Sequence, residues 1–181
     1  VDGEVKDIKA TGTITNVGGP VDNPITFTTL ENFKDGNYTI EQVVGKLTIT
    51  KAGSLGLTVK GAERKYNGEP LSAEKVEASV TEGTTISYST DDGKTWKAEA
   101  PSITNAGTLT VKVKAENPNY ETVTEAYELK VTKREVTLIS GSASKEYDGT
   151  ELTKPEVTVS GDGFVDGEVK DIKATGTITN V

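Results

Sequence analysis

The sequence predicts an all-β protein built from small repeated modules. Three observations lead to this prediction. Apolar and polar residues alternate with a period of two in several runs, as in strands that bury one face. Gly, Asn, Asp and Pro separate these runs, as in tight turns. The first seventeen residues, 1–17, recur without a difference at 165–181, which indicates a tandem array.

The long repeat has a period of 164 residues, from position 1 to position 165, and it contains a fainter repeat. KYNGEPL around Tyr66 is echoed by EYDGTEL around Tyr147, 81 residues later. DGNY ending at Tyr38 is echoed by NPNY ending at Tyr120, 82 residues later. We therefore interpret the long period as two diverged modules of about 82 residues each.

One module is whole and the other is split by the ends of the chain. Residues 52–133 form the complete module. Residues 134–181 supply the N-terminal part of the next module, and residues 1–51 supply the C-terminal part. If the complete module is an elongated rod, these two parts cannot meet within one molecule. We expect each part to be completed by neighbouring repeats, along a continuous filament or between chains joined head to tail.

Four runs carry the alternation that predicts half-buried strands: 8–14, 46–51, 108–116 and 126–132. In 108–116, TLTVKVKAE, the apolar parity is Leu109, Val111, Val113 and Ala115. A sheet with one apolar face must cover that face. Sandwiches of some seven short strands per module are the simplest arrangement.

Turns and short helices complete the expected elements. TDDGK, residues 90–94, has the Asp-Gly of a tight hairpin and lies between ISYS and TWKA. The only helical candidates are a turn at 71–75 and a second segment at 29–33.

Composition limits the classes of function. The chain has no Cys, His or Met, so disulfides, thiol nucleophiles and histidine ligands or bases are excluded, and an oxidising extracellular setting suits it. The net charge of -8 argues against nucleic acid and anionic membranes as partners. No apolar run approaches the roughly 18 residues of a membrane span, and no phosphate-binding motif is visible. We expect no enzymatic activity, no cofactor and no membrane insertion.

Several segments resemble a known family: EYDGTEL, KYNGEPL, YSTDDGKTW, PSITNAGTLTVKVKAENPNYE and the closing LKVTKR. They are similar to the YDG-type and MBG-type immunoglobulin-like tandem repeats of bacterial, mostly Gram-positive, cell-surface adhesins. The resemblance implies immunoglobulin-like β-sandwich modules, with a β-grasp-like variant as the alternative, in an elongated array. It also implies a secreted or wall-attached fibrous protein whose repeats form a stalk or carry weak binding. It brings no catalytic residues.

Two acidic groups are candidates for a calcium site, because calcium prefers six to eight oxygen ligands. They are Asp91 with Asp92, and Asp162 with Asp166 and Glu168. The alternative is that these acids stabilise turns beside glycine by bonding their own backbone.

Aromatic residues are candidates for binding. Tyr66 and Tyr147 recur at equivalent points, so they could form a binding ledge, or each ring could cap the core with its hydroxyl on a backbone group. Trp96 could stack on a sugar or pack within its own module.

An internal Lys–Asn crosslink is a further hypothesis, since Asn16, repeated as Asn180, and Asn105 recur in both modules. Such a bond needs a buried, neutral lysine and a nearby carboxylic acid. Ordinary turns are the alternative.

Together these observations predict a structural repeat unit, the stalk or fibre of a bacterial surface adhesin, located at the cell surface or in the cell wall. It would project a distal domain or assemble head to tail, with adjacent repeats as partners. The alternative is a carbohydrate- or host-protein-binding adhesive module.

Overall fold

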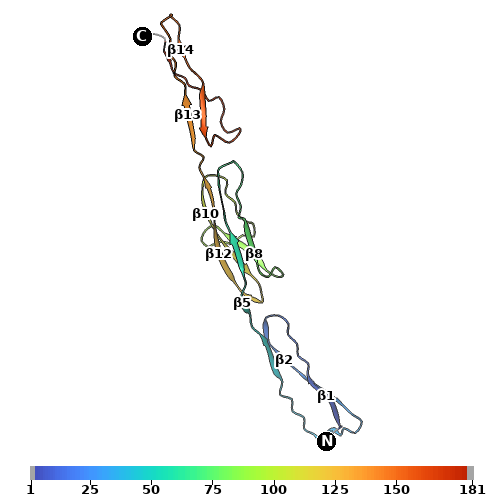
Figure 1. The fold of residues 1–181 in the computed structure, drawn as a ribbon. Helices are drawn as coiled ribbons and strands as arrows, with labels where there is room; N and C mark the ends of the chain where they lie inside the picture. The colour runs from blue at the N-terminus through green and yellow to red at the C-terminus, as the bar shows by residue number, and fades with distance from the viewer. Residues whose placement is uncertain (1–2, 179–181) are drawn as a thin grey trace. The chain divides into compact units, whose positions relative to one another are not determined.

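The predicted all-β class is confirmed by a computed structural model, which describes residues 3–178 (Figure 1). The elements follow in this order: β1 (Val5–Ala10), β2 (Gly18–Asn23), β3 (Ile25–Thr29), the 3-10 turn η1 (Asp35–Asn37), β4 (Gly45–Ile49), β5 (Ala52–Ser54), β6 (Leu57–Lys60), β7 (Ala62–Lys65), β8 (Lys75–Ala78), β9 (Thr85–Ser89), β10 (Gly107–Glu116), β11 (Tyr120–Glu121), β12 (Val123–Thr132), β13 (Val136–Ser140), β14 (Leu152–Thr153), β15 (Val157–Gly161) and β16 (Thr177–Ile178).

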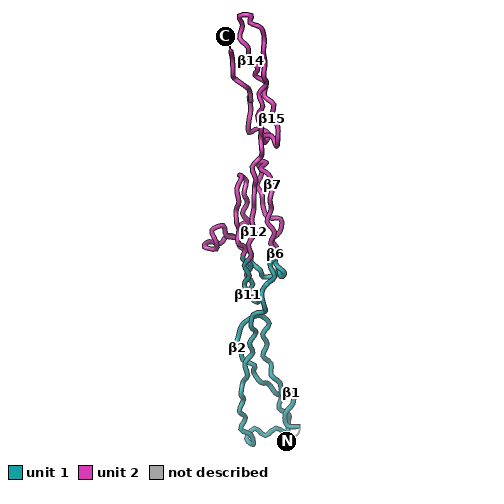
Figure 2. The backbone as a smooth tube through the Cα atoms, turned by 60° about the vertical axis from the view of Figure 1, so that its left-hand side comes forward, with its two compact units in different colours: residues 1–57, 78–86, 114–124 teal, residues 58–77, 87–113, 125–181 magenta. Residues whose placement is uncertain are grey.

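The chain divides into two compact units (Figure 2). Unit 1 contains residues 1–57, 78–86 and 114–124, and unit 2 contains residues 58–77, 87–113 and 125–181. The segment 52–133 therefore contributes to both units, and each unit combines part of this segment with one flank of the chain.

The two longest strands follow the alternation in the sequence. In β10, Val111, Val113 and Ala115 are fully buried, while the residues between them lie on the opposite, more exposed face. In β12, Leu129 and Val131 are buried on every second position in the same way. The predicted strands at 108–116 and 126–132 are thus confirmed, with their apolar parity facing inward.

These strands belong to a four-stranded sheet of mixed direction, with the order β7-β12-β10-β9. β7 runs parallel to β12, with Ala62 opposite Leu129 and Lys65 opposite Thr132. Just before β7, a Cβ on Gly61 would lie 1.9 Å from the carbonyl oxygen of Glu128, so only glycine permits this close backbone approach. Local alternation did not predict the parallel partner.

In unit 1 a hydrophobic cluster draws on both ends of the 52–133 segment. Its buried members are Leu55, Ala78 and Ala115. The side chains packed against them are Leu57, Val80, Ile86, Tyr120 and Val123. The early and late halves of this segment therefore cover each other's apolar side chains.

The flanking segments form two-stranded ribbons. Within 1–51, β1 pairs with β3 and β2 with β4, all antiparallel. Within 134–178, β13 pairs with β15 and β14 with β16, also antiparallel. None of the described residues in either flank is buried: all buried residues lie between Leu55 and Val131.

The flanks instead carry the large hydrophobic side chains that remain exposed. Among the described residues these are Ile8, Val21, Tyr38, Ile40, Val43, Val44, Leu138, Ile139, Tyr147, Val159, Phe164, Val169 and Ile178. The expected strand at 8–14 is only partly present, because β1 ends at Ala10. Ile8 is 64% exposed because no second layer covers its face of the ribbon.

Neither helical candidate is a helix. Leu71 forms a bridge with Ile103, and β8 begins at Lys75. In 29–33, β3 ends at Thr29 and is followed by a turn. Segments this short do not repay the cost of nucleating a helix. The predicted hairpin turn is present, with positive φ at Asp92 (65°) and Gly93 (91°).

Candidate functional site

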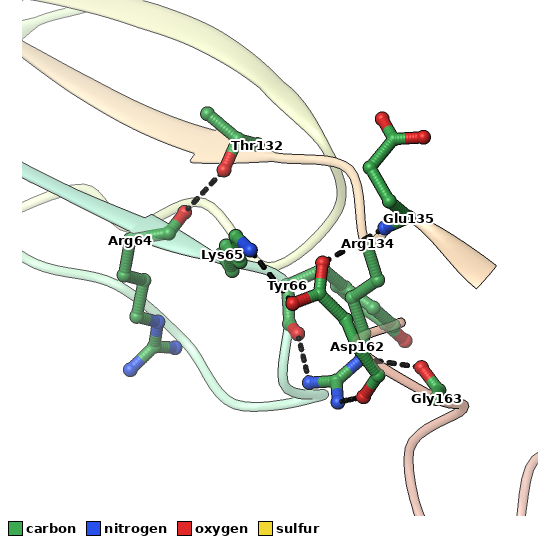
Figure 3. Close-up of polar contacts among 8 residues, drawn as sticks. All are labelled: Arg64, Lys65, Tyr66, Thr132, Arg134, Glu135, Asp162 and Gly163. Atoms are coloured by element: carbon green, nitrogen blue, oxygen red, sulfur yellow. Dashed lines mark hydrogen bonds and ion pairs between the residues drawn. The ribbon is translucent and has the colours of Figure 1, made fainter. Parts of the chain in front are cut away.

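The densest polar contacts surround Arg134, the first residue of the predicted split module (Figure 3). The half-buried guanidinium donates to three backbone carbonyls. Nε donates to Gly163 O at 2.7 Å, Nη1 to Tyr66 O at 3.2 Å, and Nη2 to Asp162 O. A planar fork of donors holds these three carbonyls in a fixed arrangement. We call these residues, with Lys65 and Glu135, the Arg134 junction.

Asp162 holds the opposite side of the junction (Figure 3). Its carboxylate accepts hydrogen bonds from Lys65 Nζ at 2.6 Å and from the Glu135 amide at 2.8 Å. Its own amide donates to Glu135 O at 2.7 Å. Lys65 first, and then the Glu135 amide, lower the pKa of Asp162. The turn that presents Asp162 requires Gly161, whose φ is +82° and whose Cβ would lie 2.3 Å from Glu135 O.

A third contact extends the junction into the loop after β15. The Tyr66 hydroxyl donates to the carboxylate of Glu168, and this hydrogen bond raises the pKa of Tyr66. A shallow hollow here is lined by Tyr66, Asn105, Phe164 and Glu168, among others. Carbonyl, carboxylate and cation are mutually satisfied in this arrangement, so it suits holding two segments together rather than catalysis.

A second junction lies in unit 1, where 1–51 meets the segment after β10. Asn119 accepts the Val17 amide through Oδ1 at 2.9 Å and the Ala52 amide through its backbone O at 2.9 Å. Asn117 orients Asn119 by accepting its amide at 3.0 Å. Asn117 is itself buried, and its Nδ2 donates to Glu82 O at 3.0 Å. Buried polar groups that are satisfied in this way favour a single geometry.

Comparison with known proteins gave no match with a family model, a curated protein or a solved structure. In the described part of the chain, no helix has the length and apolar character needed to cross a bilayer.

The first acidic pair lies in the 90–94 hairpin turn. Asp91 accepts hydrogen bonds from Ser89 Oγ at 2.7 Å, the Thr95 amide at 2.9 Å and Thr95 Oγ1 at 2.6 Å. These donors, the Thr95 hydroxyl most of all, lower the pKa of Asp91. Asp92 forms an ion pair with Lys112 at 2.6 Å. The turn itself therefore occupies the oxygens that a calcium ion would need.

The second acidic group lies partly in the Arg134 junction. Asp162 is bound by Lys65, and Glu168 is bound by Tyr66, while Asp166 lies in the loop between them. Among the described residues, no group of three or more His, Cys, Asp or Glu side chains could hold a metal ion.

The predicted aromatic candidates differ in their surroundings. Tyr66 is half-buried and its hydroxyl reaches a carboxylate, not the backbone group that we expected. Tyr147 is 78% exposed. Trp96 is half-buried, and a Cβ on Gly93 would lie 3.5 Å from its Cζ2, so the indole lies against its own hairpin.

The asparagines of the crosslink hypothesis are exposed at positions 16 and 105, and Asn180 lies outside the described residues. Asn16 contacts the Asn119 side chain at 3.5 Å. No lysine in the described part of the chain is buried, so the desolvated amine that a crosslink needs is missing from that part.

Sequence reasoning missed Arg134 and Asn119. One signal could have found Arg134: it stands 82 positions after Ala52, at the start of the other module, where an alanine cannot make the same contacts. The partners of Arg134 are backbone carbonyls, however, and no side-chain pattern announces them.

Replacing Arg134 by Lys should loosen the Arg134 junction, because one ammonium cannot replace a planar fork that reaches three carbonyls. We expect the Asp162 amide to exchange its hydrogen at least tenfold faster, as measured by NMR-detected exchange. The Lys112→Arg variant, which keeps the charge of an exposed ion pair elsewhere, should leave this amide unchanged. Equal protection in Arg134→Lys and the wild type would contradict the role given to Arg134.

The Arg134 junction should weaken in acid. Because the pKa of Asp162 is lowered from its ordinary 3.8, its contribution is fully present above about pH 4 and is lost as the pH falls through the lower, folded-state value. The amide shift of Glu135, followed by NMR, should titrate with a midpoint below 3.8. In Asp162→Asn this titration should disappear, and a midpoint at or above 3.8 would contradict the contact.

Proposed function

We propose that the chain is the structural repeat unit of a bacterial surface adhesin, a stalk or fibre that projects a distal domain. The observation that carries this proposal is the uneven burial of apolar side chains. The 52–133 segment holds all of the buried residues, and both flanks hold the exposed large hydrophobics of the described part of the chain. Such side chains are normally covered in a finished protein.

The repeat explains what would cover them. Since 1–17 and 165–181 have the same sequence, the chain spans one period of an array and a short overlap. In such an array each flank would meet the missing half of its module. The two junctions would then recur along the array, and length would change by whole units. Immunoglobulin-like sandwich modules, in tandem, are part of this proposal.

Composition supports an extracellular location at the cell surface or in the cell wall. The chain lacks Cys, Met and His, so no oxidation of sulfur and no change in histidine charge can alter it. Its acidic balance of -8 favours solubility at high local density.

Chains with one, two and four periods test the stalk. Contour lengths from electron microscopy should rise by an equal increment for each added period, because each repeat contacts only its neighbours. A compact particle whose length does not grow with the number of periods would overturn the proposal. The complete gene product is the second test: a secretion signal and a wall anchor are expected in it.

An adhesive module that binds a carbohydrate or a host protein is the alternative. One observation favours it: Phe33 and Tyr38 stack with ring centroids 5.4 Å apart and an interplanar angle of 7°, beside an apolar hollow in 1–51. A glycan array with Tyr38→Ala and Trp96→Ala variants separates the two functions. Binding that is lost in either variant supports the adhesive module, and no binding on the array favours the stalk.

A further inference from the structure

We propose that residues 134–161 of a second copy of this chain, the preceding repeat, dock on the apolar hollow of 1–51 and add residues 143–146 as a parallel strand beside β4. This inference rests on the proposed function, because it names the partner that completes the split module. The hollow is lined by apolar side chains that include Ile8, Ile25, Phe27, Phe33 and Ile40.

The faint repeat converts the observed strand pairing into an expected one. β12 corresponds to β4 at a spacing of 82, which places Leu129 at Leu47 and Lys130 at Thr48. β7 corresponds to 143–146, counted back from Tyr66 and Tyr147. The parallel register of Ala62 with Leu129 then becomes Ala143 with Leu47, and each following pair keeps the same step.

The place for this strand is open. β10 follows the turn TNAG as β2 follows TNVG, so the β2–β4 pair corresponds to the β10–β12 pair. β12 has β10 on one edge and β7 on the other. Among the described residues, β4 has β2 as its only strand neighbour. A free strand edge with unpaired amides and carbonyls is a template for one more strand.

The uncovered side chains match the covered ones position by position. Leu57 packs against the cluster of unit 1, and its counterpart Leu138 is 52% exposed. Buried Ala78 corresponds to Val159, which is 40% exposed. In the register of β13 with β15, Leu138 lies opposite Val159, so both can enter one apolar surface.

On the receiving side, Tyr120 packs against the same cluster in the whole module, and its counterpart Tyr38 is exposed beside the hollow. The two flanks therefore carry the two halves of one core. The match departs at one point: Ser142 stands at the place of Gly61, so the two backbones must lie further apart there, and pairing is expected to begin at Ala143.

Cysteine crosslinking tests this register, because the chain has no cysteine of its own. The pair Ser144→Cys and Thr48→Cys corresponds to Glu63 and Lys130, which lie outside the core and form an ion pair at 2.9 Å. Neighbouring strands are about 4.8 Å apart, within the usual Cα separation of a disulfide. The chain to use contains two periods, residues 1–164 followed by 1–181, with Ser144→Cys in the first copy and Thr48→Cys in the second.

We expect this pair to oxidise to a disulfide between the two copies, identified by mass spectrometry after proteolysis. In the one-period chain, the same pair should give dimers and longer ladders whose yield rises with concentration. Glu63→Cys with Lys130→Cys, placed in the observed register of the 52–133 segment, is the matched positive control. Ser144→Cys with Thr50→Cys, two residues out of register, should oxidise at least tenfold more slowly.

The inference is overturned if the positive control forms its disulfide and the Ser144–Thr48 pair does not, or if the out-of-register pair reacts equally fast. A disulfide within single one-period chains, at a yield independent of concentration, would also overturn it. Contour length separates this failure from failure of the stalk. Two-period chains that lengthen regularly without the disulfide keep the stalk and reject the register, whereas compact crosslinked chains do the reverse.

Discussion

Leu129→Ala should destabilise the 52–133 segment by about 2–5 kcal/mol, whereas Leu47→Ala should cost less than about 1 kcal/mol in the one-period chain. The two leucines are equivalent in the repeat, 82 positions apart. Leu129 is fully buried, so its removal leaves a cavity that the sheet cannot refill. Leu47 is only half-buried, and its shortening leaves little unfilled space.

Urea unfolding, followed by far-UV circular dichroism and by Trp96 fluorescence, gives both values. In the two-period chain, Leu47→Ala in the second copy should cost more than in the one-period chain, because the first copy now covers this position. Equal costs at Leu129 and Leu47 in the one-period chain would mean that 1–51 already has a closed core.

Gly61→Ala should cost about 3 kcal/mol or more. The added Cβ would lie 1.9 Å from Glu128 O and within 3.0 Å of the Glu128 amide nitrogen. Both atoms are backbone, so no side chain can move aside, and β7 must separate from β12. We expect early loss of protection at the Tyr66 amide, which donates to Thr132 O at 2.9 Å at the end of this pairing.

The matched control for this substitution is Gly53→Ala in β5. A Cβ on Gly53 would have no heavy atom within 4 Å, so this variant should unfold within about 0.5 kcal/mol of the wild type. A neutral Gly61→Ala variant would show that β7 does not lie against β12 as described.

Local patterns predicted those features that depend on neighbours in sequence. The inward parity of Val111, Val113 and Ala115 follows from the geometry of an extended strand, in which alternate side chains point to opposite faces. The hairpin turn of Asp92 and Gly93 follows from their tolerance of positive φ. Both are decided within a few residues, and both were predicted.

The candidate site depended on pairings between distant residues and was not predicted. Arg134 binds carbonyls at Tyr66, Asp162 and Gly163, and carbonyls are present in every residue. The acids at Asp91 and Asp92 were attractive as ligands because of their spacing, yet their partners Thr95 and Lys112 occupy them. Only the folded arrangement shows which groups are already satisfied.

By itself, the sequence determined the all-β class, the 164-residue period and the absence of thiol and imidazole chemistry. The tertiary structure decided which apolar residues are covered. Leu47 and Leu129 share one local pattern, and the alternation marks both as inward. Burial, however, needs a second surface on the other side of the side chain, and that surface comes from residues far along the chain or from a neighbouring repeat.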